Sequence, residues 1–320
     1  MQTPELNIVM YHYVRNLPQT RYPRIKGLLV DEFRSQIEWL SSEFEMVTLD
    51  SALEFLRGHY KPRRQLCMLT FDDGLKEHFT DVMPMLAERR IQGIFGIITS
   101  CVQEHRVASV HMNHFLTAAL DFDEYQTSFL AELQSVSPGL IDTIAIDPGV
   151  AQHSYPLDTR EMAMFKLLIN FLLPAEVRDR VIRTLFERFC GDEDQFAREL
   201  YMSWAEIRQL QAAGMLLAGH THWHRPLSSL SEEELAFDVT TCRTLLNENS
   251  DRQELWPFSY PYGKRNSYSP SVVDRLRQAG YDCALATEAG QNISGTPLFE
   301  LFRVDCKAIV ETLQSRFATV

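Results

Sequence analysis

The sequence lacks the features that mark several common protein classes. Its 320 residues contain no run of lysine and arginine, and the formal net charge is -12. Nucleic-acid binding is therefore disfavoured, because it depends largely on neutralising phosphates. No apolar run approaches the roughly 20 residues that span a bilayer. The first residues are polar and acidic, unlike a secretory signal, so we expect a cytoplasmic protein without a membrane span.

Cysteine is also sparse, and no two cysteines are close in the sequence. The six cysteines are scattered over positions 67, 101, 190, 242, 283 and 306, with no CxxC pair. This distribution is typical of buried reduced thiols and disfavours a disulfide framework or a zinc knuckle. The length permits two domains, although a barrel of this size often forms a single domain. Nothing in the sequence predicts the oligomeric state.

What the sequence does contain is an alternation of apolar strands and amphipathic helices. We expect strands at 6–14, 66–71, 91–98, 214–219, 256–259, 283–286 and 301–305. The helical patterns between them favour a parallel sheet or barrel. From 101 to 200 no convincing strand appears, and helical patterns occur at 122–133, 160–173, 175–189 and 194–200. We interpret 101–200 as a helical insertion within one α/β domain that covers 1–320.

Two adjacent acids, Asp72 and Asp73, follow the apolar strand 66–71 and precede Gly74. Adjacent ionised carboxylates repel each other, so a bound cation or a shared proton is needed to stabilise them. The carboxyl end of a buried strand is also where α/β enzymes place their chemistry. An Asp-Asp-Gly turn that only caps a helix is the alternative, and this segment alone does not decide between them.

Three histidines in five residues follow a later strand, in the segment His220-Thr221-His222-Trp223-His224. His220 and His224 would share one face if a helical turn begins here. Two imidazoles and one carboxylate can hold a divalent metal and leave positions open for water and substrate. Such a metal acidifies its water and polarises a carbonyl oxygen, which suits hydrolysis. One of the paired acids would then bind metal and the other would act as a general base; the alternative is an exposed polar turn with incidental histidines.

Three motifs together resemble the NodB-homology polysaccharide deacetylases, carbohydrate esterase family 4. They are Thr70-Phe71-Asp72-Asp73-Gly74, His220-Thr221-x-x-His224 and Tyr260-Pro261-Tyr262-Gly263. The resemblance covers most of the chain outside the helical insertion. It implies a distorted (β/α)7 barrel and a deacetylase that depends on a divalent metal, with Zn2+ as the expected ion.

The resemblance also assigns roles to individual residues. Asp72 would be the catalytic base, and Asp73 would bind the metal together with His220 and His224. His222 falls between the ligand positions and is either a support for the ligands or simply exposed. Tyr262 would line the substrate groove, and its backbone N–H would help to stabilise the oxyanion.

The sequence departs from the family pattern in two places. Ser259 stands where the family often carries an arginine that orients the base, and no histidine follows His224 to serve as the general acid. However, the segment around His12 resembles the opening of circularly permuted members that act on poly-N-acetylglucosamine, in which the acid histidine lies on the first strand. The resemblance therefore implies that His12 is the general acid.

The last predicted strand offers two partners for these acids, because the first and last strands of a closed barrel are neighbours. Asp305 would orient His12 and raise its pKa. Arg303 is an alternative guide for either His12 or Asp72.

Taken together, these features predict a metal-dependent hydrolase that removes an N-acyl group, expected to be acetyl, from an amino sugar. The expected cytoplasmic location favours a precursor of a surface polysaccharide, such as lipopolysaccharide or capsule, over a finished polymer. Two alternatives remain open. One is an amidase that acts on a non-sugar substrate such as a cyclic ureide. The other is a catalytically silent barrel that binds a glycan or a protein partner.

Overall fold

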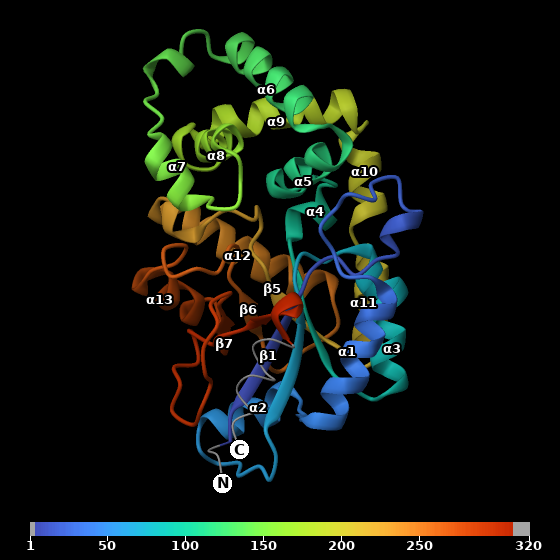
Figure 1. Cartoon of the computed structure of the whole chain (residues 1–320). Coiled ribbons are helices and arrows are strands. Elements are labelled where there is room, and N and C mark those ends of the chain that lie inside the picture. The colour runs from blue at the N-terminus through green and yellow to red at the C-terminus, as the bar shows by residue number, and fades with distance from the viewer. Residues whose placement is uncertain (1–3, 310–320) are drawn as a thin grey trace. The chain divides into compact units, whose positions relative to one another are not determined.

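The computed structural model describes residues 4–309 and divides the chain into two compact units (Figure 1). The first, which we call the barrel unit, comprises residues 4–16, 26–106 and 197–309 of the described part of the chain. The second, which we call the helical unit, comprises Leu17–Ile25 and Val107–Phe196. The interpretation of 101–200 as an insertion within one domain stays a prediction.

The barrel unit is built on one curled sheet whose paired strands are all parallel in the described residues. The strand order is β7-β6-β5-β4-β3-β1-β8, and β2 pairs with β3. The strands are β1 (Leu6–Tyr11), β2 (Glu45–Met46), β3 (Leu66–Phe71), β4 (Gly93–Ile97), β5 (Leu216–Gly219), β6 (Pro257–Ser259), β7 (Cys283–Leu285) and β8 (Val304–Asp305). This half-barrel with surrounding helices confirms the predicted distorted (β/α) barrel.

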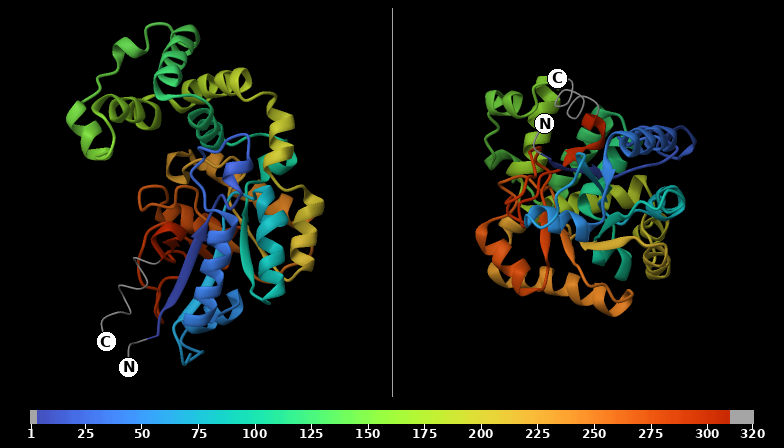
Figure 2. Two further views of the ribbon diagram at one scale, coloured as in Figure 1. Left: turned by 45° about the vertical axis from the view of Figure 1, so that its right-hand side comes forward. Right: turned by 90° about the horizontal axis from the view of Figure 1, so that it is seen from below.

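Helices follow most of the strands, and all of those given below except α2 pack against the outer side of the sheet (Figure 2). They are α1 (Val30–Glu43), α2 (Leu49–Leu56), α3 (Met83–Glu88), α4 (Thr99–Gln103), α11 (Trp204–Ala212), α12 (Glu232–Asn249) and α13 (Pro270–Gln278). The side chain of Ser203 caps α11, and Glu206 completes a capping box there. Among residues 4–309, no helix is long and apolar enough to cross a membrane.

The strands are buried on both faces, because side chains alternate between two separate apolar clusters. In β3, Cys67, Leu69 and Phe71 belong to the cluster shared with the outer helices. Leu66 and Met68 belong instead to a cluster in the interior of the curled sheet, which α2 also joins. Since alternate residues of a strand share one face, the positions that face the interior continue from Leu66 and Met68 through Thr70 to Asp72, at the carboxyl end of β3. We call these positions the interior series of the strand. The apolar interior thus becomes polar at the carboxyl end of β3.

The last strand is shorter than the predicted strand 301–305, although its neighbours are those expected. β8 begins only at Val304, which lies opposite Val9 of β1. The Asn292 side chain occupies the place of a partner strand, because it binds both the N–H and the C=O of Phe302. Leu301 pairs with Leu285 of β7. The segment 301–305 thus contacts both edges of the sheet and closes it.

The helical unit consists of helices and connecting turns in its described residues. Its helices include α5 (Ser109–Ala119), α6 (Phe122–Val136), α7 (Pro148–Ser154), α8 (Arg160–Leu167), α9 (Ala175–Phe189) and the start of α10 (Glu193–Leu200). α5 and α7 are absent from the predicted helices. The turn predicted at 147–149 is the start of α7, where the Asp147 carboxylate accepts from the N–H groups of Gly149 and Val150. Phe196 makes aromatic edge contacts with Phe115 and with Phe186, which contribute to the packing of this unit.

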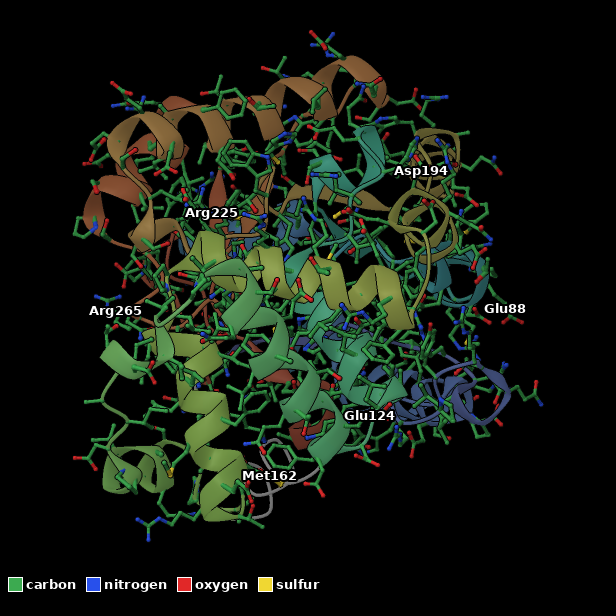
Figure 3. The ribbon with its side chains drawn as sticks, turned by 90° about the horizontal axis from the view of Figure 1, so that it is seen from above. Glu88, Glu124, Met162, Asp194, Arg225 and Arg265 are labelled. Atoms are coloured by element: carbon green, nitrogen blue, oxygen red, sulfur yellow. The ribbon has the colours of Figure 1, made fainter. Side chains whose placement is uncertain are left out.

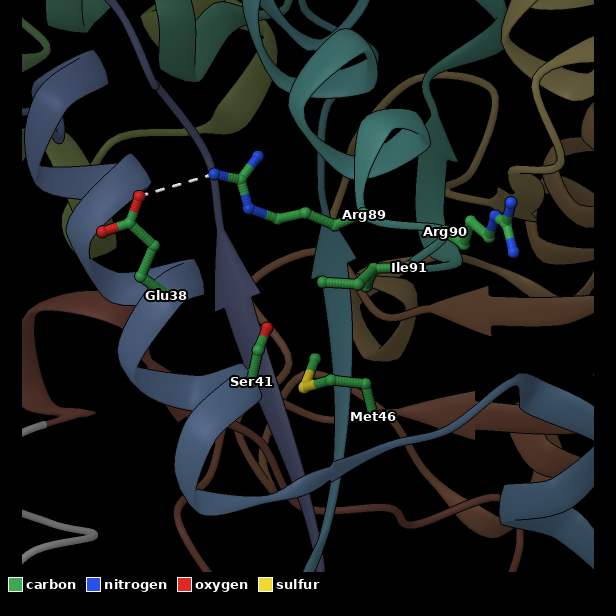
Figure 4. A pocket seen from close by; sticks show the side chains of 6 residues that line it. All are labelled: Glu38, Ser41, Met46, Arg89, Arg90 and Ile91. Carbon is green, nitrogen blue, oxygen red and sulfur yellow. Dashed lines mark hydrogen bonds and ion pairs between the residues drawn. The ribbon is translucent and has the colours of Figure 1, made fainter.

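A surface pocket of about 560 Å³ lies at the opposite end of the sheet from the acidic motif (Figure 4). Its lining residues come from α1, β2 and the turn before β4: Glu38, Ser41, Met46, Arg89, Arg90 and Ile91. Arg89 pairs with Glu38 and Glu88, so its charge is already compensated. In barrels, the amino-terminal end of the strands contributes to stability and the opposite end carries the chemistry. We therefore place the functional site at the carboxyl ends.

Candidate active site

The predicted site residues converge at the carboxyl ends of neighbouring strands. Asp72 directly follows β3, and His220 directly follows β5. Both continue the interior series of their strands, so their side chains enter the same end of the curled sheet. β4, which lies between these strands, contributes Gly96 at the same level, with no side chain of its own. The sheet therefore brings together groups that lie about 150 residues apart in the sequence.

Asp73, His220 and His224 form the one group in residues 4–309 whose donor atoms are placed to hold a metal ion. One donor atom of each residue lies within 4.8 Å of the others. Oδ1 of Asp73 lies 3.3 Å from Nε2 of His220 and 3.5 Å from Nε2 of His224. All three residues are buried. The predicted set of two imidazoles and one carboxylate is thus assembled.

The hydrogen bonds around His220 fit a metal ligand. Its Nδ1 lies 2.8 Å from the carbonyl oxygen of Ser259 and can only donate to it. This bond fixes the tautomer that carries the Nε2 lone pair, which faces Asp73. A carboxylate with two neutral imidazoles is a donor set suited to Zn2+ and to other divalent transition metals. The residues therefore fit the metal that the sequence predicts, with positions left open for water.

Arg303 supplies the guanidinium that the third motif lacks. Its Nη1 donates to Oδ1 of Asp72 at 3.0 Å, and its Nη2 lies 2.8 Å from Oδ2. Nη1 also reaches Oγ1 of Thr70, and Nε donates to the carbonyl oxygen of Ala286. Both members of the pair are almost fully buried. Of the two guides that the sequence left open, the geometry places Arg303 on Asp72.

The pairing keeps Asp72 ionised. Burial raises the pKa of the Asp72 carboxyl, whereas the charges of Arg303, His220 and His12 lower it, and the net pKa lies well below its usual range. An ionised carboxylate can accept a proton from water, as a general base must. The two adjacent aspartates therefore have different partners: Asp73 faces the imidazoles and Asp72 faces the guanidinium.

Left-handed backbone is concentrated at this site. Four of the six non-glycine residues with positive φ among residues 4–309 belong to the motifs: Asp73 (82°), Thr221 (65°), His224 (54°) and Tyr262 (62°). Such conformations cost about 1–3 kcal/mol each and persist only where the surroundings enforce them. The helical turn that was expected between His220 and His224 is absent. These two residues meet instead across a non-helical turn in which Thr221 has a positive φ. Strain of this kind is typical of functional sites.

Three further residues were predicted for the site: two of them, His12 and Tyr262, lie near it, and the third, Asp305, points elsewhere. His12 follows β1, is partly buried and acts on the pKa of Asp72, so it lies near the base. The Tyr262 ring lies 5.4 Å from that of His224 and is 44% exposed, as a groove residue would be. Asp305 does not have the place expected of a partner that orients His12. It is exposed, and its carboxylate accepts from the N–H of Lys307. The tight turn after β8 draws this carboxylate toward the backbone that follows.

His222 is not exposed, which decides between the two alternatives for it. Its Nδ1 lies 3.0 Å from Oγ1 of Thr99, and its Nε2 lies 3.0 Å from Glu104. Both partners belong to α4 or its carboxyl-terminal end. Arg225, labelled in Figure 3, follows the turn and pairs with Glu234 at the start of α12. The histidine segment is thus tied to two helices.

Comparison with known proteins leads to the same family. The model of the polysaccharide deacetylase family matches residues 177–284, which include His220, His224 and Tyr262. The "Putative polysaccharide deacetylase YxkH" of Bacillus subtilis (strain 168) is 25% identical over 136 residues, 42% of this chain and 46% of that protein. Both sequence matches show the resemblance of this chain to polysaccharide deacetylases. The matched part spans less than half of this curated relative.

Solved structures of deacetylases share the fold across nearly the whole chain. The Streptococcus pyogenes deacetylase PplD, in complex with acetate, aligns with a TM-score of 0.58 at 11% identity, covering 97% of this chain and 99% of its own. IcaB from Ammonifex degensii aligns with a TM-score of 0.57 at 18% identity, covering 100% and 99%. At these identities the likeness concerns the fold. The resemblance in sequence is limited to the matched residues.

Gly96 is a site residue that the sequence analysis missed. A glycine inside a buried strand often marks a close approach, and this signal was available in Gly93-Ile94-Phe95-Gly96. A Cβ on Gly96 would lie 3.2 Å from Oδ1 of Asp72 and 3.3 Å from Cβ of His220. The missing side chain therefore leaves the room in which these two groups lie side by side.

We expect Gly96→Ala to lower kcat/KM by about tenfold or more, because small displacements of catalytic groups have large effects on rate. Its free energy of unfolding should change by less than about 1 kcal/mol, since alanine suits a strand better than glycine. Gly93→Ala in the same strand is the control: its Cβ would meet Leu86 and Phe95 at 2.8 Å, so it should lose stability. Equal activity of Gly96→Ala and the wild type would contradict the assignment.

His78 is a buried imidazole beneath the site and predicts a pH dependence of stability. Its Nε2 lies 2.9 Å from the carbonyl oxygen of His12, and its ring makes edge contacts with the stacked rings of Phe71 and Phe95. Burial lowers its pKa from 6.5 to about 4. Between these pH values the unfolded chain binds a proton at His78 that the folded chain does not bind. The contribution of His78 to the free energy of unfolding is therefore complete above pH 6.5 and is lost as the pH falls toward 4.

For His78 alone we expect the free energy of unfolding to fall by roughly 2–3 kcal/mol between pH 7 and pH 4.5. Urea unfolding of the metal-free wild type and of His78→Gln at both pH values measures this contribution. The amide of glutamine can still donate to the carbonyl of His12 but does not titrate, so its fall should be smaller by that amount. An identical pH dependence of the two proteins would exclude His78 as the cause.

Proposed function

We propose that this protein is a metal-dependent N-deacetylase of an amino sugar. The observation that carries the proposal is that two adjacent aspartates have different partners. Asp73 faces two imidazoles, and Asp72 faces a buried guanidinium. The family match supports the reaction class. Asp73, His220 and His224 would hold the metal, with Zn2+ as the expected ion. The substrate that we propose is a precursor of a surface polysaccharide.

The chain's own residues would act in three ways. Asp72, held by both guanidinium nitrogens of Arg303, would take a proton from the attacking water. His12 would give a proton to the departing amine nitrogen as the C–N bond breaks. The backbone N–H of Tyr262 would donate to the oxygen on which negative charge develops. When bound, the metal would supply Lewis acidity toward the water and the carbonyl oxygen.

A substrate panel tests the proposal. Purified protein supplied with zinc is incubated with N-acetylglucosamine oligomers, nucleotide-linked N-acetyl sugars and cyclic ureides, and released acetate and ring opening are measured. We expect acetate from at least one N-acetyl sugar and no ring opening. Asp73→Asn prepared in the same way provides the blank. Ring opening of ureides without release of acetate would establish the amidase alternative and refute the sugar deacetylase.

For His12 we expect His12→Gln to lower kcat by about 10²–10⁴-fold, because a general acid contributes a factor of this size. The metal content should stay stoichiometric, since His12 is not among the three ligands. Substrates with a better leaving amine should lose less activity, because they need less protonation. Full activity of His12→Gln would return this residue to a structural role.

The silent-barrel alternative loses its main support in this structure. It was favoured by the serine at position 259, where the base lacks its usual guide. Arg303, which directly precedes β8, reaches Asp72 with two nitrogens, so the base has a guide. No other observation favours a purely binding function.

A further inference from the structure

The turn that carries His220 and His224 is held in shape by groups outside it. Thr221 and His224 lie on either side of the two middle residues of the turn and have φ values of 65° and 54°. Within the turn, Oγ1 of Thr221 accepts from the N–H of His224 at 2.8 Å. This bond does not use the N–H groups of His222 and Trp223, which donate to a group outside the turn. Since left-handed backbone persists only where the surroundings enforce it, those outside partners decide where the imidazoles point.

The amino-terminal end of α4 supplies one set of these partners. The backbone N–H of Thr99 donates to the carbonyl oxygen of Thr221 at 3.2 Å, and that of Ser100 donates to the carbonyl oxygen of His222 at 3.1 Å. The first N–H groups of a helix have no partner within it, so they are available to hold the turn. The carbonyl side of the turn is thereby fixed.

A single carboxylate holds the opposite side. Asp238 lies in the middle of α12 and is 0% exposed. Its Oδ1 accepts from the N–H of His222 at 2.8 Å, and its Oδ2 accepts from the N–H of Trp223 at 3.1 Å. These two N–H groups are the consecutive amides between the ligand positions. Burial of a carboxylate is costly unless it is hydrogen-bonded, and here both oxygens of Asp238 accept from N–H groups of this one turn.

We propose that Asp238 is a positioning residue for the metal site: by binding the amides of His222 and Trp223, it sets the relative orientation of His220 and His224. The inference rests on the proposed function, because it concerns the metal that the three ligands would hold. Asp238 itself touches neither the ligands' imidazole nitrogens nor Asp73. It acts through the backbone that carries the ligands, and nothing in the sequence motif points to it.

The probe is Co2+, whose visible absorption reports the geometry of its ligands. Asp238→Asn keeps the size of the side chain, but its amide group faces one of the two N–H donors. At saturating Co2+, we expect a shifted or weaker absorption band than in the wild type, and an affinity for Zn2+ lowered by about 10–100-fold, the size usual for residues that orient metal ligands. Glu233→Gln, an exposed acid on the same helix, is the matched control and should behave as the wild type.

Asp238→Glu provides a second variant that keeps the charge but moves the carboxylate by one methylene, and it carries the test if the asparagine variant does not fold. It should also alter the Co2+ spectrum. An unaltered spectrum at saturation in the folded variants overturns the inference, including the case in which only the affinity falls, because lost charge alone explains that result. If the wild type binds neither Co2+ nor Zn2+, the proposed metal site fails and this inference fails with it. A wild type that binds metal beside variants with its spectrum refutes the role of Asp238 alone.

Discussion

Replacing Arg303 by methionine should lower the free energy of unfolding by about 3–5 kcal/mol, because removal of one member leaves the buried Asp72 carboxylate without its partner. Methionine fills a similar volume, so the effect would come mainly from the charge and not from a cavity. Hydrolytic activity should fall as well, since the base loses the two bonds that orient it. Urea unfolding with chelator present and kcat/KM with zinc present measure the two effects separately.

The double variant Arg303→Met/Asp72→Asn separates the pair from its surroundings. Once both charges are removed, most of the lost stability should return, because paired residues are strongly non-additive. Activity should not return, since the base is absent. Arg303→Lys keeps the charge but not the planar fork, and we expect it to fall between the wild type and Arg303→Met. A double variant as unstable as the sum of the single variants would show that the two side chains do not interact.

The second large effect distinguishes the adjacent aspartates. Asp72→Asn should retain stoichiometric zinc while losing about 10²–10⁴-fold in kcat, the usual contribution of a general base. Asp73→Asn should lose the metal, and with it the activity. Zinc content by mass spectrometry and kcat on the best N-acetyl substrate give the comparison, and circular dichroism confirms the fold. Metal retained by Asp73→Asn, or lost by Asp72→Asn, would reverse or remove the assigned roles.

The sequence predicted the parallel sheet because its strands and helices alternate clearly. Much of the site could be predicted as well, because its residues stand directly after strands. Asp72 and His220 follow apolar strands directly, so their place at one end of the barrel follows from topology. The neighbouring positions of the first and last strands were also expected from closure. Pairing of β1 with β8 confirms this expectation.

The rest depended on side-chain contacts that a pattern cannot encode. Arg303 and Asp305 lie two residues apart on the same predicted strand, and both were reasonable partners for an acid. The choice between them depends on Asn292, which interrupts that strand at Phe302, and on the short turn that draws Asp305 to Lys307. Gly96 matters through the side chain that it lacks. Such features are decided by packing in three dimensions, not by local propensity.

The origin of Arg303 has a consequence for the order in which the protein becomes active during its synthesis. The metal ligands are complete once residue 224 has been made, and Asp72 much earlier, but the guanidinium that orients Asp72 arrives about 80 residues later with the segment that closes the sheet. A nascent chain could therefore gather its ligands while its base still lacks a guide. Chemical competence and completion of the barrel would be reached in the same step.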